Sequence, residues 1–205
     1  MSTPARRKHW DDVYGRKAES EVSWFEATPS RSLELIEQTG VGRSAPIIDI
    51  GGGLSRLADS LVAAGYADVT VLDISGEAVR QLMARQPPGA PVHAIVSDVT
   101  TWQPDRTYAV WHDRAVLHFL LDEADRSAYR SKLLTALASQ GHVIIATFAP
   151  SGPERCSGLP VRRYGREDLQ AWLGKEFVLL DSFEFDHTTP SGAVQRFHVG
   201  RFQRS

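Results

Sequence analysis

The sequence predicts a doubly wound α/β fold around a mostly parallel, seven-stranded sheet with an antiparallel strand at its C-terminal end. Three observations support this prediction. Short apolar runs, too brief for buried helices, alternate along the chain with segments of helical periodicity. The first run ends directly in the triplet Gly51–Gly53, and the second ends in Asp73, about twenty residues later. The chain closes with two runs joined by Thr-Thr-Pro-Ser-Gly, which is typical of an antiparallel pair.

The individual elements follow from breakers, caps and periodicity. Gly40 ends the first helix of the domain, while Ser75 is placed to cap a later helix that Pro87 and Pro88 end. The run 143–148 is continuously apolar, as expected of a strand covered on both faces. In chain order, we expect helices over 29–39, 55–64, 75–86, 123–138 and 167–173, strands over 46–50, 69–72, 92–96, 108–111, 143–148, 177–185 and 194–202, and a loop over 149–164.

Length and composition limit the classes of function. A chain of 205 residues fits one domain with a sizeable core. A formal net charge of -2 argues against a generally basic surface for nucleic acid. The only cysteine, Cys156, can form no intramolecular disulfide, and no second cysteine supports a metal site. The sequence shows no bilayer-spanning run and no signal peptide, so we expect a cytoplasmic protein without membrane association, and oligomeric state is not predicted.

The segment Ile47–Ser55 is predicted to cradle a cofactor. Its glycines let the backbone turn tightly and approach a ligand with no Cβ in the way. Asp73 can accept hydrogen bonds from both hydroxyls of a ribose. Arg56 stands where a dinucleotide fingerprint has its third glycine, and Asp49 would repel a pyrophosphate but attract a positively charged ligand. The pattern therefore favours an adenosine derivative that carries positive charge.

These residues resemble the class I S-adenosylmethionine-dependent methyltransferases, a Rossmann-like family whose first motif is D-x-G-x-G-x-G or S. Asp49, Gly51, Gly53 and Ser55 fill that motif in register, and the ribose-binding acid follows at Asp73. An acid near the end of the third strand binds the adenine amine in that family, and Asp98 matches it. The segment W-H-D-R-A-V-L-H-F-L also resembles the fourth motif of thiopurine-type methyltransferases. The resemblance implies S-adenosylmethionine as cofactor, S-adenosylhomocysteine as product, and a binding set of Asp49, Gly51, Gly52, Gly53, Ser55, Asp73, Ile74, Ser97, Asp98, Val99 and His112.

Residues 1–28 are expected to form an ordered aromatic arm ahead of a single methyltransferase domain over 29–205. The aromatic face that holds Trp10 and Tyr14 at helical spacing could simply pack on the domain. It could instead act as a lid, in which Tyr14 or Trp24 covers the methionine end of the cofactor and offers an aromatic face to the sulfonium. On the second reading, Trp10, Tyr14 and Trp24 join the cofactor-binding residues.

Methyl transfer from a sulfonium is an in-line displacement that mainly requires alignment and exclusion of water, so a base is optional. His112 and His118 are the candidate bases because histidine titrates near neutral pH, with Asp113 as an orienting or accepting carboxylate. Each also has a structural explanation. His112 could bond only locally, His118 could be a buried core histidine, and Asp113 could cap a helix or pair with its neighbour.

Arginines supply the candidates for substrate binding. Arg114 follows the fourth predicted strand, and Arg162 and Arg163 lie in the loop after the fifth. Arginine binds carboxylate or phosphate through paired hydrogen bonds, so these residues could recognise an anionic substrate. For the loop pair, the alternative is an ordinary solvated loop.

Several functions remain open on the sequence alone. The leading hypothesis is a methyltransferase acting on an oxygen, nitrogen or sulfur atom of a small molecule. The aromatic leader also resembles protein-lysine methyltransferases, so a protein substrate is the alternative. A nucleic-acid substrate ranks lower because an N-P-P-Y-like motif is missing from the fourth strand. A nucleotide-dependent oxidoreductase is disfavoured by Arg56 and Asp49, and a non-catalytic cofactor-binding domain is the remaining possibility.

Overall fold

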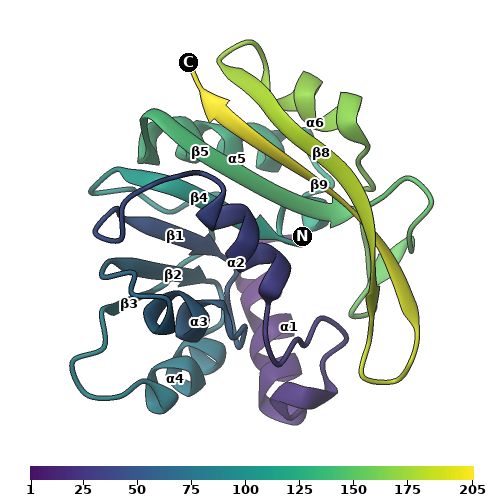
Figure 1. Ribbon diagram of the computed structural model, residues 1–205. Coiled ribbons are helices and arrows are strands. Elements are labelled where there is room, and N and C mark those ends of the chain that lie inside the picture. The colour runs from purple at the N-terminus through teal and green to yellow at the C-terminus, as the bar shows by residue number, and fades with distance from the viewer.

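Seven strands form one sheet in the order β3-β2-β1-β4-β5-β9-β8 in the computed structural model, which describes residues 1–205 (Figure 1). Strands β1 to β5 pair in parallel, whereas β9 lies antiparallel between β5 and β8. This topology confirms the predicted fold class. The strands are β1 (Ile47–Ile50), β2 (Val69–Asp73), β3 (Val92–Val96), β4 (Tyr108–Arg114), β5 (Leu137–Phe148), β8 (Phe177–Thr188) and β9 (Val194–Arg204).

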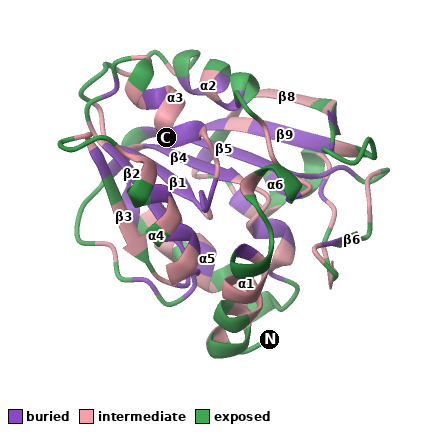
Figure 2. Ribbon diagram, turned by 90° about the horizontal axis from the view of Figure 1, so that it is seen from below, coloured by how far each residue is buried: buried purple, intermediate pink, exposed green.

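Helices cover both faces of the sheet, and the strands are its most buried part (Figure 2). Helices α5 and α6 pack on one face through a core that includes Tyr129 and Leu169. On the other face, α2, α3 and α4 pack through a second core that includes Ile36 and Leu61. Successive strand residues alternate between the two cores because side chains of a strand point to opposite faces. The helices are α1 (Thr3–Arg16), α2 (Ser30–Glu37), α3 (Leu57–Ala63), α4 (Gly76–Arg85), α5 (Glu123–Ala136) and α6 (Arg166–Leu173).

The strand order creates the crevice in which a ligand can bind. The chain builds β1, β2 and β3 outward in one direction, and β4 then returns to the other side of β1. The carboxyl ends of β1 and β4 therefore lie side by side at a point where the strand order reverses. Open α/β sheets bind their ligands at this kind of topological switch point.

Among the differences from the predicted bounds, those around β4 and β5 affect the site. Strand β4 continues to Arg114 rather than ending at Trp111, and β5 begins at Leu137, which pairs with Tyr108 before the ladder shifts register. The predicted loop after β5 contains a small hairpin of β6 (Arg155–Cys156) and β7 (Leu159–Pro160). Its two turn residues, Ser157 and Gly158, both have positive φ, which matches the twist of a two-residue hairpin turn. No helix in the structure combines the length and apolarity needed to cross a membrane.

Candidate cofactor cavity and its surroundings

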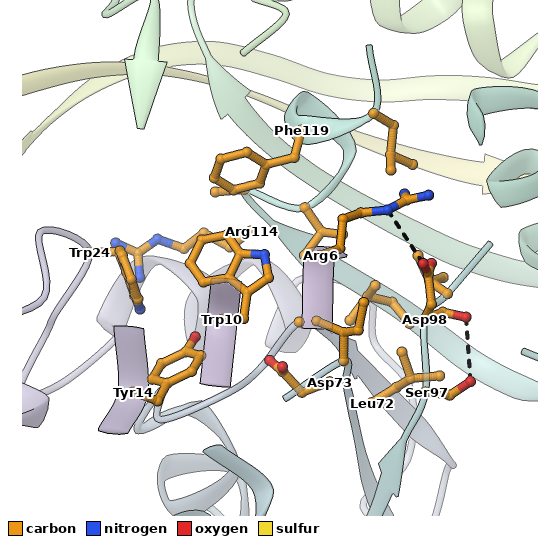
Figure 3. Close-up of a pocket in the computed structure, with 17 residues that line it drawn as sticks. Arg6, Trp10, Tyr14, Trp24, Leu72, Asp73, Ser97, Asp98, Arg114 and Phe119 are labelled. Carbon is orange, nitrogen blue, oxygen red and sulfur yellow. Dashed lines mark hydrogen bonds and ion pairs between the residues drawn. The ribbon is translucent and has the colours of Figure 1, made fainter. Parts of the chain in front are cut away.

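A cavity with about 710 Å³ of empty space lies at the carboxyl ends of β1 to β4 (Figure 3). The sheet contributes Gly51 after β1, Asp73 at the end of β2, Asp98 after β3 and Arg114 at the end of β4. The N-terminal arm closes the cavity from the other side with aromatic side chains.

Asp73 presents a buried carboxylate to this cavity. It accepts a 2.8 Å hydrogen bond from the Ser75 N–H and another from the backbone of Gly53. Burial raises the pKa of Asp73 to about 7, and the negative charges of Asp49 and Asp11 add to this rise, while the two backbone donors oppose it. The remaining acceptor capacity can take hydrogen bonds from vicinal hydroxyls.

Asp98 forms the opposite end of the cavity. One of its oxygens accepts bonds from the Thr100 N–H at 2.9 Å and the Thr100 hydroxyl at 2.7 Å. The other accepts a bond from the Thr3 hydroxyl at 2.8 Å, with Arg6 Nε 3.5 Å away. Burial alone would raise the pKa of Asp98, but these bonds and the charge of Arg6 together hold it below its usual value. The carboxylate is therefore ionised at neutral pH.

The glycine turn after β1 is packed so closely by neighbouring side chains that no Cβ fits at Gly51 or Gly53. Gly51 has a φ of +65°, and a Cβ there would overlap the side chain of Val116. A Cβ on Gly53 would lie 2.5 Å from the Tyr14 hydroxyl and 3.0 Å from an Asp73 oxygen. Bare backbone is thus required where the turn approaches the cavity.

Aromatic side chains line the arm side of the cavity. The ring of Trp10 lies 5.8 Å from that of Trp24 and 5.1 Å from that of Phe119, in both cases edge to face. Tyr14 packs edge to face on Trp24 at 6.0 Å. Aromatic faces in this arrangement can accommodate a flat ligand and attract a cation.

The arm is fixed to the domain by polar contacts as well as by packing. Asp11 accepts a 2.6 Å bond from the Ser75 hydroxyl and a 3.3 Å bond from the Glu77 N–H at the start of α4. Gln81 donates a 3.1 Å bond to the carbonyl of Tyr14. The sequence pattern does not predict these polar contacts. It does predict one shared face of α1 for Arg6, Trp10 and Tyr14, because they occur at intervals of four residues.

His112 lies behind the cavity rather than in it. Its Nδ1 is 2.7 Å from Asp49 Oδ1, and its Nε2 is 3.0 Å from the Ser32 hydroxyl. All three side chains are buried between the sheet and α2. The Asp49 carboxylate is therefore engaged by the imidazole, and the pair braces β1 against β4.

Asp113 points to the opposite face of the sheet, where it caps the short 3₁₀ turn Leu117–Phe119. It accepts bonds from the Val116 and Leu117 N–H groups at 2.8 and 3.0 Å and from the Tyr129 hydroxyl at 2.6 Å. Burial raises the pKa of Asp113 to about 6 against the effect of these donors. The capping role considered from the sequence is the one that the geometry supports.

His118 is fully buried between Phe119 and Phe148, and neither ring nitrogen has a hydrogen-bond partner. Burial lowers its pKa to about 3, so the ring is neutral at physiological pH. None of the three expected proton-handling residues lines the cavity. For His112 and Asp113 the physical reason is that β4 stays extended through Arg114, so these successive side chains point to opposite faces of the sheet. His118 lies beyond β4 in the 3₁₀ turn, where its ring packs on Phe148.

The loop residues after β5 also lie outside the cavity lining. Arg162 stacks over Tyr164, 5.2 Å from the ring centre, and Arg163 donates a 3.2 Å bond to the Gly152 carbonyl. Cys156 is buried in the hairpin, and burial raises the pKa of its thiol to about 11. Ser55 accepts a 3.1 Å bond from the N–H of Leu57, the first residue of α3.

The structure thus brings together most, though not all, of the expected binding residues. Those that line the cavity are Trp10, Tyr14, Trp24, Gly51, Asp73, Ile74, Ser97, Asp98, Val99 and Arg114. Those outside its lining are Asp49, Gly52, Gly53, Ser55, His112, Asp113, His118, Arg162 and Arg163. The cavity also has walls that the sequence analysis missed, among them Arg6, Ala115, Val116 and Phe119.

Arg114 is the one arginine of β4 at the cavity, and it lies on the Trp24 side, away from Asp98 (Figure 3). Its Nη2 is 3.2 Å from a Glu26 oxygen, and its side chain is 12% exposed. Glu26 in turn lies 3.4 Å from His187 Nδ1, while His187 Nε2 donates a 2.7 Å hydrogen bond to the Ser23 carbonyl. Because a carbonyl only accepts, that nitrogen is the protonated one. The arm is therefore tied to β4 and β8 beside the cavity.

Comparison with known proteins agrees with this architecture. Residues 47–141 match the model of a family described as a methyltransferase domain. The chain is 24% identical over 150 residues to the eEF1A lysine and N-terminal methyltransferase homolog of Drosophila melanogaster, a match that covers 68% of this chain and 22% of that protein. The chain spans about a fifth of the length of the curated relatives that it matches.

Solved structures match the fold of nearly the whole chain, although their sequence identity to it is low. A SAM-dependent methyltransferase from Anabaena variabilis superposes with a TM-score of 0.76 at 13% identity, covering 99% of this chain and 95% of that one. The 1,6-didemethyltoxoflavin-N1-methyltransferase of Burkholderia thailandensis gives a TM-score of 0.69 at 19% identity, covering 98% and 85%. Residues 47–141 thus match a methyltransferase-domain family, and the chain as a whole has the fold of solved S-adenosylmethionine-dependent methyltransferases.

Proposed function

We propose that this protein transfers the methyl group of S-adenosylmethionine to a small-molecule acceptor. The observation that carries the proposal is the placement of two buried carboxylates, Asp73 and Asp98, along one cavity whose floor is the bare backbone of Gly51. The match to a methyltransferase-domain family and the fold also support methyl transfer. The residues present fit the cofactor, since a ribose needs an acceptor for its two hydroxyls and an adenine amine needs an acceptor, and Asp73 and Asp98 offer both in one cavity.

Each part of the cavity has a role in binding this cofactor. Asp73 would accept hydrogen bonds from the ribose hydroxyls, and Asp98 from the adenine amine. Ile74 and Val99, each next to one of these carboxylates in the sequence, line the same cavity and would contact the adenine ring. The cofactor supplies a methyl group on a positively charged sulfur, and Trp10 and Tyr14 would offer aromatic faces to that charge.

The chain's own contribution to the reaction would be alignment and exclusion of water. The arm, fixed through Asp11 and Gln81, covers the cavity and limits solvent access. Asp113 fixes the Leu117–Phe119 turn and thereby the position of Phe119 against Trp10. His112 and His118 are engaged or enclosed elsewhere, so we assign them positioning and packing roles.

A small acceptor is favoured over a protein one by the enclosure of the cavity. The arm contributes Arg6, Trp10, Tyr14 and Trp24 to its wall, so a lysine-bearing segment would have to displace packed aromatic side chains. The toxoflavin methyltransferase, which resembles this chain over nearly its whole length, is named for a small heterocyclic acceptor. The eEF1A methyltransferase homolog keeps protein lysine as the second candidate.

Two measurements test the proposal. Titration calorimetry should show binding of S-adenosylmethionine and S-adenosylhomocysteine, with Asp73→Ala as the control that weakens both. Label from a tritiated cofactor should enter the small-molecule fraction of a cell extract. Label in macromolecules would favour the protein substrate instead, and tight cofactor binding without any S-adenosylhomocysteine release would indicate a non-catalytic domain.

A further inference from the structure

Arg114 lines the cavity and carries a buried donor group that the protein leaves without a hydrogen-bond partner. That group is Nη2, and its guanidinium lies over the Phe197 ring. Its one charged contact, Nη2 to Glu26 at 3.2 Å, does not meet hydrogen-bond geometry. A nearly buried donor without a hydrogen-bond acceptor costs free energy. We therefore expect a bound ligand to supply an acceptor for Arg114.

The charges around Arg114 leave room for an anion once the cofactor is present. Glu26 from the arm and Asp49 from β1 face the guanidinium, along with the buried, neutral thiol of Cys156. Asp49 is already paired with His112. Glu26 forms the ion pair of Arg114. The sulfonium of a bound cofactor would add positive charge to the cavity, and an anionic group in the acceptor would offset it.

The cavity also lacks a group suited to removing a proton from the acceptor. Asp98 is held ionised by Thr100, Thr3 and Arg6, and burial keeps the pKa of the Tyr14 hydroxyl well above its usual value. Asp73 is committed to the ribose in the proposed function. An acceptor that arrives already ionised needs no base.

Resting on the proposed methyl transfer, we infer that the acceptor is a flat aromatic molecule with an ionised oxygen or sulfur nucleophile, and that Arg114 binds this anion. The aromatic walls of Trp10, Trp24 and Phe119 suit the flat ring. A lone pair of the anion forms the new bond to the methyl carbon, and the carbon–sulfur bond breaks with its electrons left on the sulfur. The negative and positive charges cancel, and no proton is transferred.

The test uses the full-length chain and matched pairs of aryl probes. Phenol, thiophenol and benzoate, each with a 4-nitro counterpart, supply ionised acceptors of different pKa, while aniline and benzylamine are the neutral and cationic controls. Release of S-adenosylhomocysteine is measured against pH for each. We expect turnover of one class of ionised probe, and that class identifies the nucleophile as oxygen or sulfur. In a plot of log kcat/KM against pH, the break should move with the pKa of the probe.

Arg114→Gln and Arg114→Lys test the residue itself. Losing a charge partner in a nearly buried site should lower kcat/KM for the ionised probes by about thirtyfold or more, with partial retention in the lysine variant. Binding of S-adenosylhomocysteine should stay within about threefold of the parent protein, because Asp73 and Asp98 hold it. The double variant with Arg114→Gln and Glu26→Gln removes both charges of the ion pair. It replaces the single variant in these measurements if Arg114→Gln is unstable.

Several results would overturn this inference while leaving the proposed function intact. One is preferred turnover of the amines, and another is a single pH break shared by all probes, which would indicate a base in the enzyme. A third is cofactor binding without turnover of any ionised probe. The fourth is a loss of S-adenosylhomocysteine affinity in Arg114→Gln without loss of methylthioadenosine affinity, which would assign Arg114 to the cofactor's carboxylate. Failure of the parent protein to bind either cofactor form would instead refute the proposed function.

Discussion

The hydroxyl of Thr3, in the first turn of α1, donates a 2.8 Å hydrogen bond to the carboxylate of Asp98, which follows β3. Arg6 approaches the same oxygen, with its Nε 3.5 Å away. The arm therefore shares a carboxylate with the end of the cavity that we assign to the adenine. Arm order and cofactor binding should be linked through this one group.

Replacing either partner should separate the two roles of Asp98. Thr3→Val removes one partly buried hydrogen bond and should lower the free energy of unfolding by about 1 kcal/mol. It should leave S-adenosylhomocysteine affinity unchanged or slightly higher, since Asp98 stays ionised and gains a free lone pair. Asp98→Asn should weaken that affinity about tenfold, because the adenine amine loses a charged acceptor. Calorimetry on both variants measures this, and a larger loss in Thr3→Val would contradict the assignment.

The turn after β1 should tolerate no side chain at its second glycine. A Cβ on Gly52 would lie 2.5 Å from an Asp49 oxygen and 2.7 Å from Val71 Cγ1, both buried side chains. Gly52→Ala should therefore destabilise the protein by about 1–3 kcal/mol and displace the turn from the cavity. Gly42→Ala is the matched control, because nothing lies within 4 Å of a Cβ there. Equal melting temperatures for the two variants would show that the turn can adjust.

Asp73 should make stability depend on pH in a predictable direction. Burial raises its pKa from 3.8 to about 7, so the folded state holds the proton more tightly than the unfolded state. The resulting stabilisation is complete below about pH 4 and is lost as pH rises to about 7, by at most about 4 kcal/mol. Urea unfolding at pH 5 and pH 8 should show this loss in the parent protein and not in Asp73→Asn. The pKa of Asp113 is also raised, but Asp113 is present in both proteins, so its contribution cancels when their pH dependences are compared.

The same carboxylate should give cofactor binding the opposite pH dependence. The ionised form is the better acceptor for ribose hydroxyls, so affinity for S-adenosylhomocysteine should rise as pH increases through about 7. Calorimetry between pH 6 and 8 measures the change. An affinity that fell over this range would mean that the protonated carboxyl is the form that binds.

His118 provides a direct test of whether a histidine base operates. Its ring packs edge to face on Phe119 and has no hydrogen-bond partner, so His118→Phe keeps the packing and removes an unsatisfied polar group. We expect an equal or higher melting temperature and retained methyl transfer. Loss of activity in a stably folded His118→Phe protein would restore the histidine as a catalytic candidate.

The sequence was most informative where local chemistry and tertiary structure agree. The turn Gly51–Gly53 and the strand-end acid Asp73 were identified because each follows an apolar run at a spacing that the sheet topology brings together, while Asp98 was identified from the family resemblance. The seven strands followed from the same alternation of runs. Local rules were sufficient here because the carboxyl ends of parallel strands meet at one edge.

The residues of β4 could not be placed from the sequence because their roles depend on where the strand ends. Extending the strand from Trp111 to Arg114 moves His112 and Asp113 out of the expected ligand-facing turn and leaves Arg114 at the cavity. The contacts of Arg6 depend on how α1 docks, which involves partners nearly a hundred residues away. Sequence periodicity indicates which side of a helix is apolar, but not the surface on which it packs.

The most direct test of the account is the binding of S-adenosylhomocysteine to the purified chain and to Asp73→Ala, measured by titration calorimetry at pH 8. We predict saturable binding of one molecule per chain, weakened at least about tenfold by the substitution, which removes a charged acceptor from two hydroxyls. Absence of binding at millimolar ligand, or equal affinity in the two proteins, would contradict the placement of the cofactor in this cavity.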